Sequence, residues 1–189
     1  MFVLNSKLKR IVSKIIALLI LIFSVACGND GRIENTISRM KSIPVVIPIE
    51  NMVRCQRNFG QDTIPTCNFR MIVYTDQSKC SSCFIKHLSV WEKYLELERD
   101  GKVGFYFIIE VPKTELDYYR KQLKYSHMNH PVYFDVDTLF KSENPHLPNE
   151  EMYHVFLVDG NNKIVMVGNP VSNLRIEEIF YKIVNGKSS

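Results

Sequence analysis

Residues 71–88, MIVYTDQSKCSSCFIKHL, contain the features that decide the fold. They begin inside an apolar, β-rich run over residues 69–75, which is typical of a buried strand. This run leads into the pair Cys80-x-x-Cys83. Behind the second cysteine, apolar residues recur at steps of four, three and four: Phe84, Leu88, Trp91 and Leu95. Such spacing places them on one face of a helix. The stretch therefore predicts a strand, two thiols and a helix, in that order.

The remaining pattern continues this alternation of strands and helices. Gly101 stands where it can end the first helix, and a second helix is predicted over residues 113–125. Further strand patterns cover residues 103–111, 131–134, 155–158 and 164–167. The last two strands are joined by a DGNN turn and form a hairpin. Ser172 or Asn173 can cap a final helix that ends at Gly186.

The spacing of Cys80 and Cys83 allows redox chemistry. Two thiols three residues apart can close a small disulfide ring, and unpaired N–H groups at a helix start stabilise the first as a thiolate. Such a thiolate attacks the disulfide of another protein, and the second cysteine resolves the mixed disulfide. Lys79 adds a positive charge beside the first thiol.

Together these features resemble the thioredoxin fold, and within it the TlpA-like envelope thiol-disulfide oxidoreductases. The resemblance covers roughly residues 69–185 and depends on MIVYTDQSKCSSC, PVYFDVD and VFLVDGNNKIVMVG. It implies an α/β fold with a mixed central sheet flanked by helices, and with an αβ insertion before the C-terminal hairpin and helix. It also implies that Cys80 attacks and Cys83 resolves.

Three positions depart from the pattern of that family. Lys79 replaces the usual aromatic residue before the first cysteine, and Tyr74 replaces a buried acidic residue six positions before it. Tyr153 stands where the family has a cis-proline facing the disulfide, with His154 after it. We therefore expect Lys79, Tyr153 and His154 near the active site, weak activity on generic substrates, and binding of Cu(I) or Zn(II) by the reduced protein with His154 as a ligand. The alternative is that His154 points along the other face of its strand.

The first 26 residues have the pattern of a signal peptide. A basic stretch precedes the uncharged run IIALLILIF, which is short for a membrane span. The following Ser24-Val25-Ala26-Cys27-Gly28 resembles a bacterial lipobox, although Ser24 stands where Leu is usual. This resemblance implies a lipid on Cys27 and a location in the cell envelope, tethered to a bacterial membrane on its periplasmic or surface side. An uncleaved N-terminal anchor with an incidental cysteine is the alternative.

Charge and composition describe the rest of the chain. The four basic residues among the first 26 account for the net charge of +4, and the remaining 20 basic residues balance 20 acidic ones. This balance argues against nucleic acid as a partner. Residues 27–43 are polar without a long periodic pattern, so we expect a flexible tether followed by one thioredoxin-like domain over residues 44–189.

The other cysteines leave alternatives open. Cys55 and Cys67 are expected to form a structural disulfide. Four cysteines remain when Cys27 is set aside, and an oxidising compartment favours the pairing of an even number of cysteines. A second redox pair is the alternative. Cys80 and Cys83 could also form an inert disulfide, or half of a zinc site with His87. If His87 does not bind zinc, we expect it in a loop or at the surface, like His127, His130 and His146.

The function predicted from these residues is membrane-anchored thiol–disulfide exchange through Cys80 and Cys83. The partners would be thiols or disulfides of exported proteins, and the chemistry requires no cofactor. The alternative is a non-catalytic thioredoxin-like lipoprotein that binds a protein partner or a metal ion. Rapid alkylation of Cys80 would favour the enzyme, and a permanently oxidised, inert pair would favour the binding module.

Overall fold

The computed structural model describes residues 12, 14–15, 31–56, 67–126 and 128–186. It divides into two compact units, Met1–Arg39 and Met40–Ser189. Residues 31–42 are helical, and the flexible tether expected over residues 27–43 stays a prediction. The predicted signal peptide and Cys27 lie outside the described residues. Within the described ranges, no helix is long and apolar enough to cross a membrane.

One mixed sheet organises the second unit, with the strand order β1-β4-β3-β2-β5-β6. The strands are β1 (Val53–Cys55), β2 (Phe69–Thr75), β3 (Val103–Glu110), β4 (Val132–Asp135), β5 (Val155–Val158) and β6 (Ile164–Val167). The pairs β2–β3 and β3–β4 are parallel, and the pairs β1–β4, β2–β5 and β5–β6 are antiparallel. The central strand β2 therefore lies between a parallel and an antiparallel neighbour.

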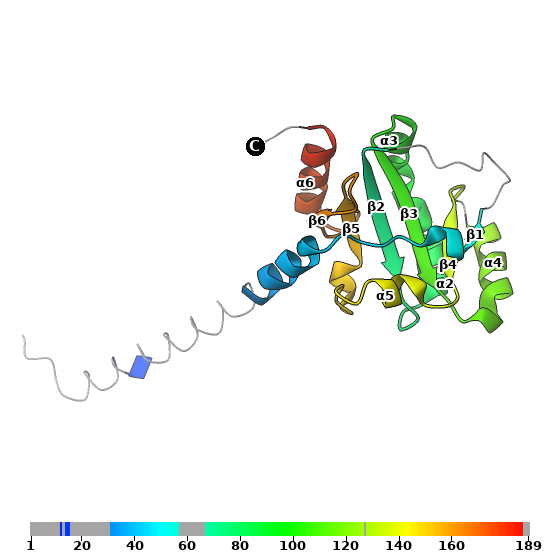
Figure 1. The fold of residues 1–189 in the computed structure, drawn as a ribbon, viewed down its shortest axis with the longest axis horizontal. Helices are drawn as coiled ribbons and strands as arrows, with labels where there is room; N and C mark the ends of the chain where they lie inside the picture. The colour runs from blue at the N-terminus through cyan, green and yellow to red at the C-terminus, as the bar shows by residue number, and fades with distance from the viewer. Residues whose placement is uncertain (1–11, 13, 16–30, 57–66, 127, 187–189) are drawn as a thin grey trace, which may run out of the picture. The chain divides into compact units, whose positions relative to one another are not determined.

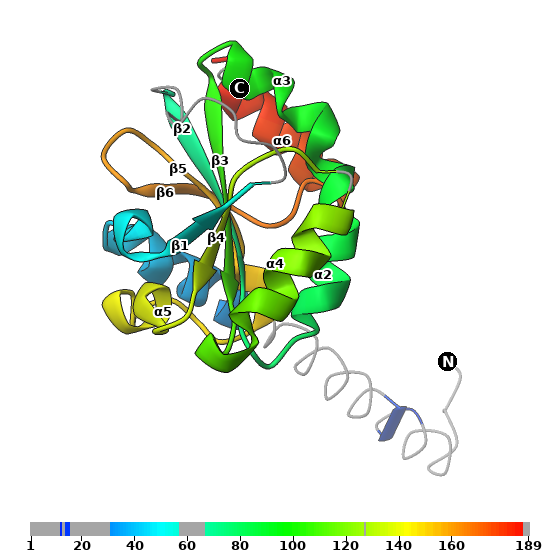
Figure 2. The ribbon, with the colours of Figure 1, turned by 90° about the vertical axis from the view of Figure 1, so that its right-hand side faces the viewer.

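Helices cover both faces of this sheet. They are α2 (Ser81–His87), α3 (Glu96–Arg99), α4 (Leu116–Tyr125), α5 (Leu139–Glu143) and α6 (Leu174–Val184), with 3₁₀ turns η1 (Ile49–Asn51), η2 (Leu88–Tyr94), η3 (Lys113–Glu115) and η4 (Glu151–Tyr153). Figure 2 shows α2, α3, α4 and α6 on one side of the sheet and α5 on the other. Because both faces are covered, β2 and β3 are apolar along most of their length.

The helix predicted after Cys83 is not continuous. It starts as α2, becomes the 3₁₀ segment η2 and resumes as α3. A 3₁₀ helix has three residues per turn, so it aligns Leu88, Trp91 and Tyr94, which are all buried. Trp91 packs in the core with its ring centroid 5.8 Å from that of Phe107. The expected apolar face is therefore present, with a different helical period.

The ends of these elements follow the sequence signals. Gly101 and Gly186 have φ values of 67° and 65°, the left-handed conformation that favours glycine after a helix. The Asn173 side chain accepts hydrogen bonds from the N–H groups of Arg175 and Ile176 at the start of α6. The order strand, helix, strand, αβ insertion, hairpin and helix is as predicted, which confirms the thioredoxin-like fold class. The short elements β1 and α5 were not predicted.

Candidate redox site

Cys80 and Cys83 form a disulfide at the start of α2, and both residues are exposed. Their Cα atoms are 5.2 Å apart. Cys80 is the N-cap residue of the helix, and its Sγ accepts a hydrogen bond from the backbone N–H of Cys83 at 3.2 Å. After reduction the same N–H is placed to stabilise a Cys80 thiolate. The pair is therefore accessible to a partner and has a donor at the first sulfur.

The two serines between the cysteines attach the motif to neighbouring elements. The buried Ser81 donates its hydroxyl hydrogen to the carbonyl oxygen of Glu110 at 3.5 Å, at the end of β3. The Ser82 hydroxyl donates to the hydroxyl of Tyr118 on α4, at 3.3 Å. These contacts tie the dithiol loop to β3 and α4. Sequence analysis missed both, since they join residues 29 and 36 positions apart.

The loop before Cys80 is held by Asp76. Its Oδ1 accepts hydrogen bonds from the backbone N–H of Ser78, at 2.9 Å, and from the Ser78 hydroxyl. Its carbonyl oxygen accepts from the N–H of Lys79 at 3.2 Å. Burial by itself raises the pKa of Asp76, but the hydrogen bonds from Ser78 and the charges of His154 and Lys141 together hold the pKa below its ordinary value. Asp76 is therefore a charged anchor for the approach to the disulfide.

Lys79 links this loop to the segment before β5. Its Nζ lies 3.0 Å from Oε2 of Glu151 in η4, and the two side chains are 45% and 69% exposed. This ion pair brings η4, which ends at the buried Tyr153, beside the dithiol loop. The positive charge expected to favour the Cys80 thiolate is therefore shared with a carboxylate. No cis peptide bond occurs among the described residues.

His154 is buried on the face of the sheet that carries α5. Its ring centroid lies 5.0 Å from that of Tyr74, whose ring in turn packs on Phe140 of α5 at 4.9 Å. His154 Nε2 donates to the carbonyl oxygen of Pro148 at 3.3 Å, and burial lowers the pKa of His154, although the charge of Asp76 opposes this. These contacts place the ring on the α5 side of the sheet. Figure 2 shows α2 on the opposite side.

The metal hypotheses concern the reduced protein, whereas the structure contains the Cys80–Cys83 disulfide. The described residues contain no group of three or more His, Cys, Asp or Glu side chains that could hold a metal ion. The position of His154 beside Tyr74 and Phe140 disagrees with its prediction as a ligand and agrees with the alternative that it lies on the other face, whereas the zinc site with His87 stays an untested alternative. His154 follows η4 and precedes β5, and its ring lines the same pocket as Phe156 of β5 and Phe140 of α5.

Tyr74, at the position where the resembled family has a buried acidic residue, contacts a buried acidic residue of the neighbouring strand β3. Tyr74 donates its phenol hydrogen to Oε2 of Glu110 at 2.5 Å, and both residues are only 7% exposed. Burial, followed by this hydrogen bond, raises the pKa of Tyr74 well above its ordinary value. An acidic residue at the end of the apolar run 103–111 was a visible signal, but the sequence did not show that it faces Tyr74.

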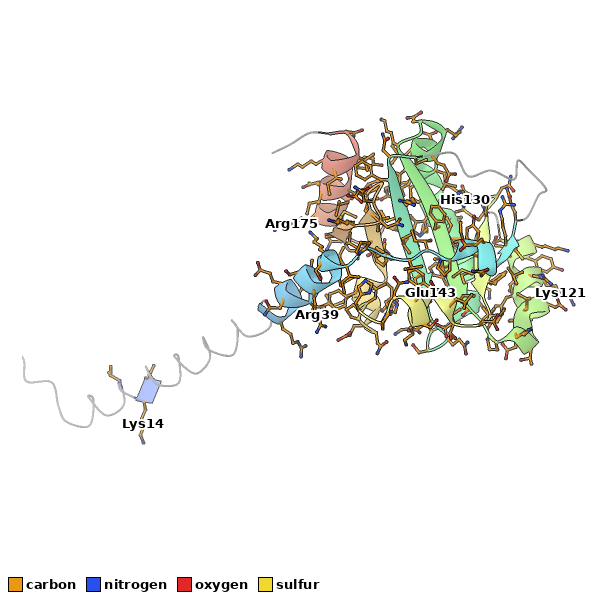
Figure 3. The ribbon with its side chains drawn as sticks, in the orientation of Figure 1. Lys14, Arg39, Lys121, His130, Glu143 and Arg175 are labelled. Carbon is orange, nitrogen blue, oxygen red and sulfur yellow. A yellow bond between two sulfur atoms is a disulfide. The ribbon has the colours of Figure 1, made fainter. Side chains whose placement is uncertain are left out.

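The remaining cysteines occupy different environments. Both Cys55 and Cys67 are half-buried free thiols in the structure, so their pairing stays a prediction that non-reducing peptide mapping tests. Cys67 Sγ donates to the carbonyl oxygen of Glu98 at 4.0 Å, and burial, then the charge of Glu98, raises the pKa of this thiol. His130, labelled in Figure 3, lies in the loop before β4 as expected, but it is buried there. Its Nε2 is 2.9 Å from Glu98 Oε2.

No protein-family model and no curated protein matches the chain. Among solved structures it is similar to peroxiredoxin Q from Xanthomonas campestris, with 11% identity over 77% of this chain and 98% of that one, at a TM-score of 0.46. It is also similar to a thioredoxin-like protein from Porphyromonas gingivalis, with 19% identity, 65% and 79% coverage and a TM-score of 0.42. The thioredoxin domain of a Bacteroides vulgatus thiol-disulfide oxidoreductase has 15% identity, 60% and 80% coverage and a TM-score of 0.40. At this distance, these likenesses do not carry an activity to this chain.

Proposed function

We propose that the protein is a membrane-anchored thiol–disulfide oxidoreductase of the bacterial cell envelope. The observation that carries this proposal is the exposed Cys80–Cys83 disulfide at the start of α2, whose first sulfur accepts the N–H of Cys83. An inert structural disulfide has no need of exposure at both sulfurs. A redox pair needs it, because the partner's sulfur must approach the attacking thiolate in line with the bond that breaks.

The reaction in the reducing direction uses both cysteines. The Cys80 thiolate attacks one sulfur of a partner disulfide, which forms a mixed disulfide and releases the other partner sulfur as a thiolate that takes a proton. The Cys83 thiolate then attacks Cys80 Sγ, and the second partner sulfur leaves as a thiol. The partner gains two electrons and two protons, and Cys80–Cys83 is oxidised. In the reverse direction the same steps oxidise two partner thiols.

The surroundings of the disulfide support this chemistry by holding the backbone. Ser81 and Ser82 attach the turn to β3 and α4, so the Cys83 N–H keeps its direction when the sulfurs change partner. Donors fixed in this way before the reaction stabilise developing charge without reorganisation. We therefore assign Ser81 and Ser82 a positioning role.

The location is proposed from the N-terminal sequence alone. A lipid on Cys27 would anchor the protein to a membrane, and export would place the dithiol where disulfides persist. In that compartment the partners are thiols or disulfides of other exported proteins.

A trapping experiment tests the function. In the reduced Cys83→Ser variant, Cys80 can attack a partner but nothing resolves the mixed disulfide, so covalent complexes should accumulate in cells and disappear on reduction. Cys80→Ser is the matched control, because it retains one thiol of the same motif and should trap far less. Equal trapping by both variants, or none by either, would reject the exchange reaction and favour a binding module with an inert disulfide.

A further inference from the structure

A groove is lined by residues of α4 and of β1, the edge strand of the sheet, which lies beside α4 in Figure 1. The groove there has a volume of about 450 Å³, within the range of roughly 300–1,000 Å³ that is usual for small-molecule sites. It is lined by Arg54, Cys55 and Gln56 from the strand side and by Asp117, Arg120, Lys121, Leu123 and Lys124 from the helix. None of these residues belongs to the Cys80–Cys83 site.

The groove concentrates positive charge in a domain that is otherwise balanced. Four of its lining residues are basic and one, Asp117, is acidic. Asp117 is paired with Arg120, whose Nη1 lies 3.1 Å from Oδ1. Lys121 and Lys124 are exposed and have no carboxylate within ion-pair distance among the described residues. Lys121 is labelled on α4 in Figure 3. A positively lined concave surface attracts anions.

A thiol lies among these cations. Cys55 ends β1 as a half-buried free thiol, and it lines the groove together with Arg54 and Arg120. The other free thiol, Cys67, has the opposite setting beside Glu98. Of the two, Cys55 is the one that lines the basic groove. A thiol in this position can react with a disulfide that the groove binds.

We propose that this groove binds a small disulfide molecule that carries several carboxylates, and that Cys55 takes up half of it as a mixed disulfide. The Cys55 thiolate attacks one ligand sulfur and the ligand's own S–S bond breaks. The other half leaves as a thiolate, which takes a proton from water. One disulfide is consumed and one is formed, so the incoming molecule is the only oxidant. The basic residues hold its carboxylates, which Arg can bind in bidentate geometry.

The test uses the full chain with Cys67→Ser, which prevents pairing of Cys55 with Cys67, and with Cys80–Cys83 left oxidised. Two probes differ in charge: oxidised glutathione carries carboxylates and is anionic, whereas cystamine is a cationic disulfide. Mass spectrometry of the peptide containing Cys55 measures the rate of mixed-disulfide formation. We expect the rate with oxidised glutathione to fall as salt is added, and the rate with cystamine to rise.

Charge variants locate the effect in the groove. Lys121→Gln/Lys124→Gln should slow the reaction with oxidised glutathione about tenfold without slowing cystamine. The matched control, Lys163→Gln/Lys182→Gln, removes the same charge from exposed positions outside the groove and should leave both rates nearly unchanged. All four lysines are exposed, so the fold tolerates the changes. An equal effect of both pairs, no modification of Cys55 by oxidised glutathione, or a Cys55–Cys67 disulfide found by non-reducing peptide mapping of the wild-type chain would overturn the proposal.

Discussion

The hydrogen bond from Tyr74 to Glu110 offers a sharp test of how the structure is held beneath the redox loop. Tyr74→Phe removes one hydroxyl and leaves the ring, so the ring contacts with Phe140 and His154 can persist. Glu110 Oε2 would then lose its 2.5 Å donor while it stays 7% exposed. The expected result is a lower free energy of unfolding.

The magnitude follows from the burial of both partners. A buried acceptor left without its donor costs about 1–3 kcal/mol, and we expect about 2 kcal/mol here because little water can reach the carboxyl group. The companion variant Glu110→Gln keeps an amide oxygen that can accept from the phenol, so it should cost less than Tyr74→Phe. The double variant should cost less than the sum of the two single variants, because they share one interaction.

Urea unfolding at pH 7, followed by circular dichroism, measures these differences. Tyr106→Phe is the matched control: Tyr106 lies on the neighbouring strand β3, and no hydrogen bond to its hydroxyl occurs among the described residues. It should change the unfolding free energy by less than about 0.5 kcal/mol. A Tyr74→Phe effect no larger than that of Tyr106→Phe would refute the reasoning.

Three further expectations concern the anchor, the redox loop and pH. Cys27→Ser should abolish incorporation of radiolabelled lipid, and unchanged labelling would refute the lipid anchor. Glu151→Gln removes the partner of Lys79, so reduced Cys80 should be alkylated faster at low salt, by about twofold for an exposed pair; an unchanged rate would contradict this. Burial lowers the pKa of His154 from 6.5, so the unfolded chain binds more protons and the unfolding free energy should fall as pH drops below 6.5, by at most about 1.4 kcal/mol per pH unit for this group. His154→Gln should flatten this dependence, although His146, with a pKa lowered by burial, keeps its own share; an unchanged pH profile would argue against the buried, neutral ring.

The sequence by itself determined the elements whose signals are local. Residues 69–75 and 103–110 are strands because their apolar, β-branched and aromatic side chains suit a strand buried on both faces. Gly101 and Asn173 mark helix ends because one adopts a positive φ and the other supplies a side-chain acceptor. The dithiol at the strand-to-helix junction could also be predicted from sequence, because the strand, the two cysteines and the helix follow one another along the chain.

Tertiary structure alone decided the contacts around that dithiol. The face occupied by His154, the pairing of Lys79 with Glu151 and the contact of Tyr74 with Glu110 depend on which strands adjoin and in what register. In parallel β2 and β3, Tyr74 lies opposite Ile108, so Glu110 is placed two residues farther along the same face. A shift of one residue would turn Glu110 to the other face, and no local pattern encodes that register. The helical period after Cys83 was decided in the same way, because packing of Leu88, Trp91 and Tyr94 on the sheet favours three residues per turn.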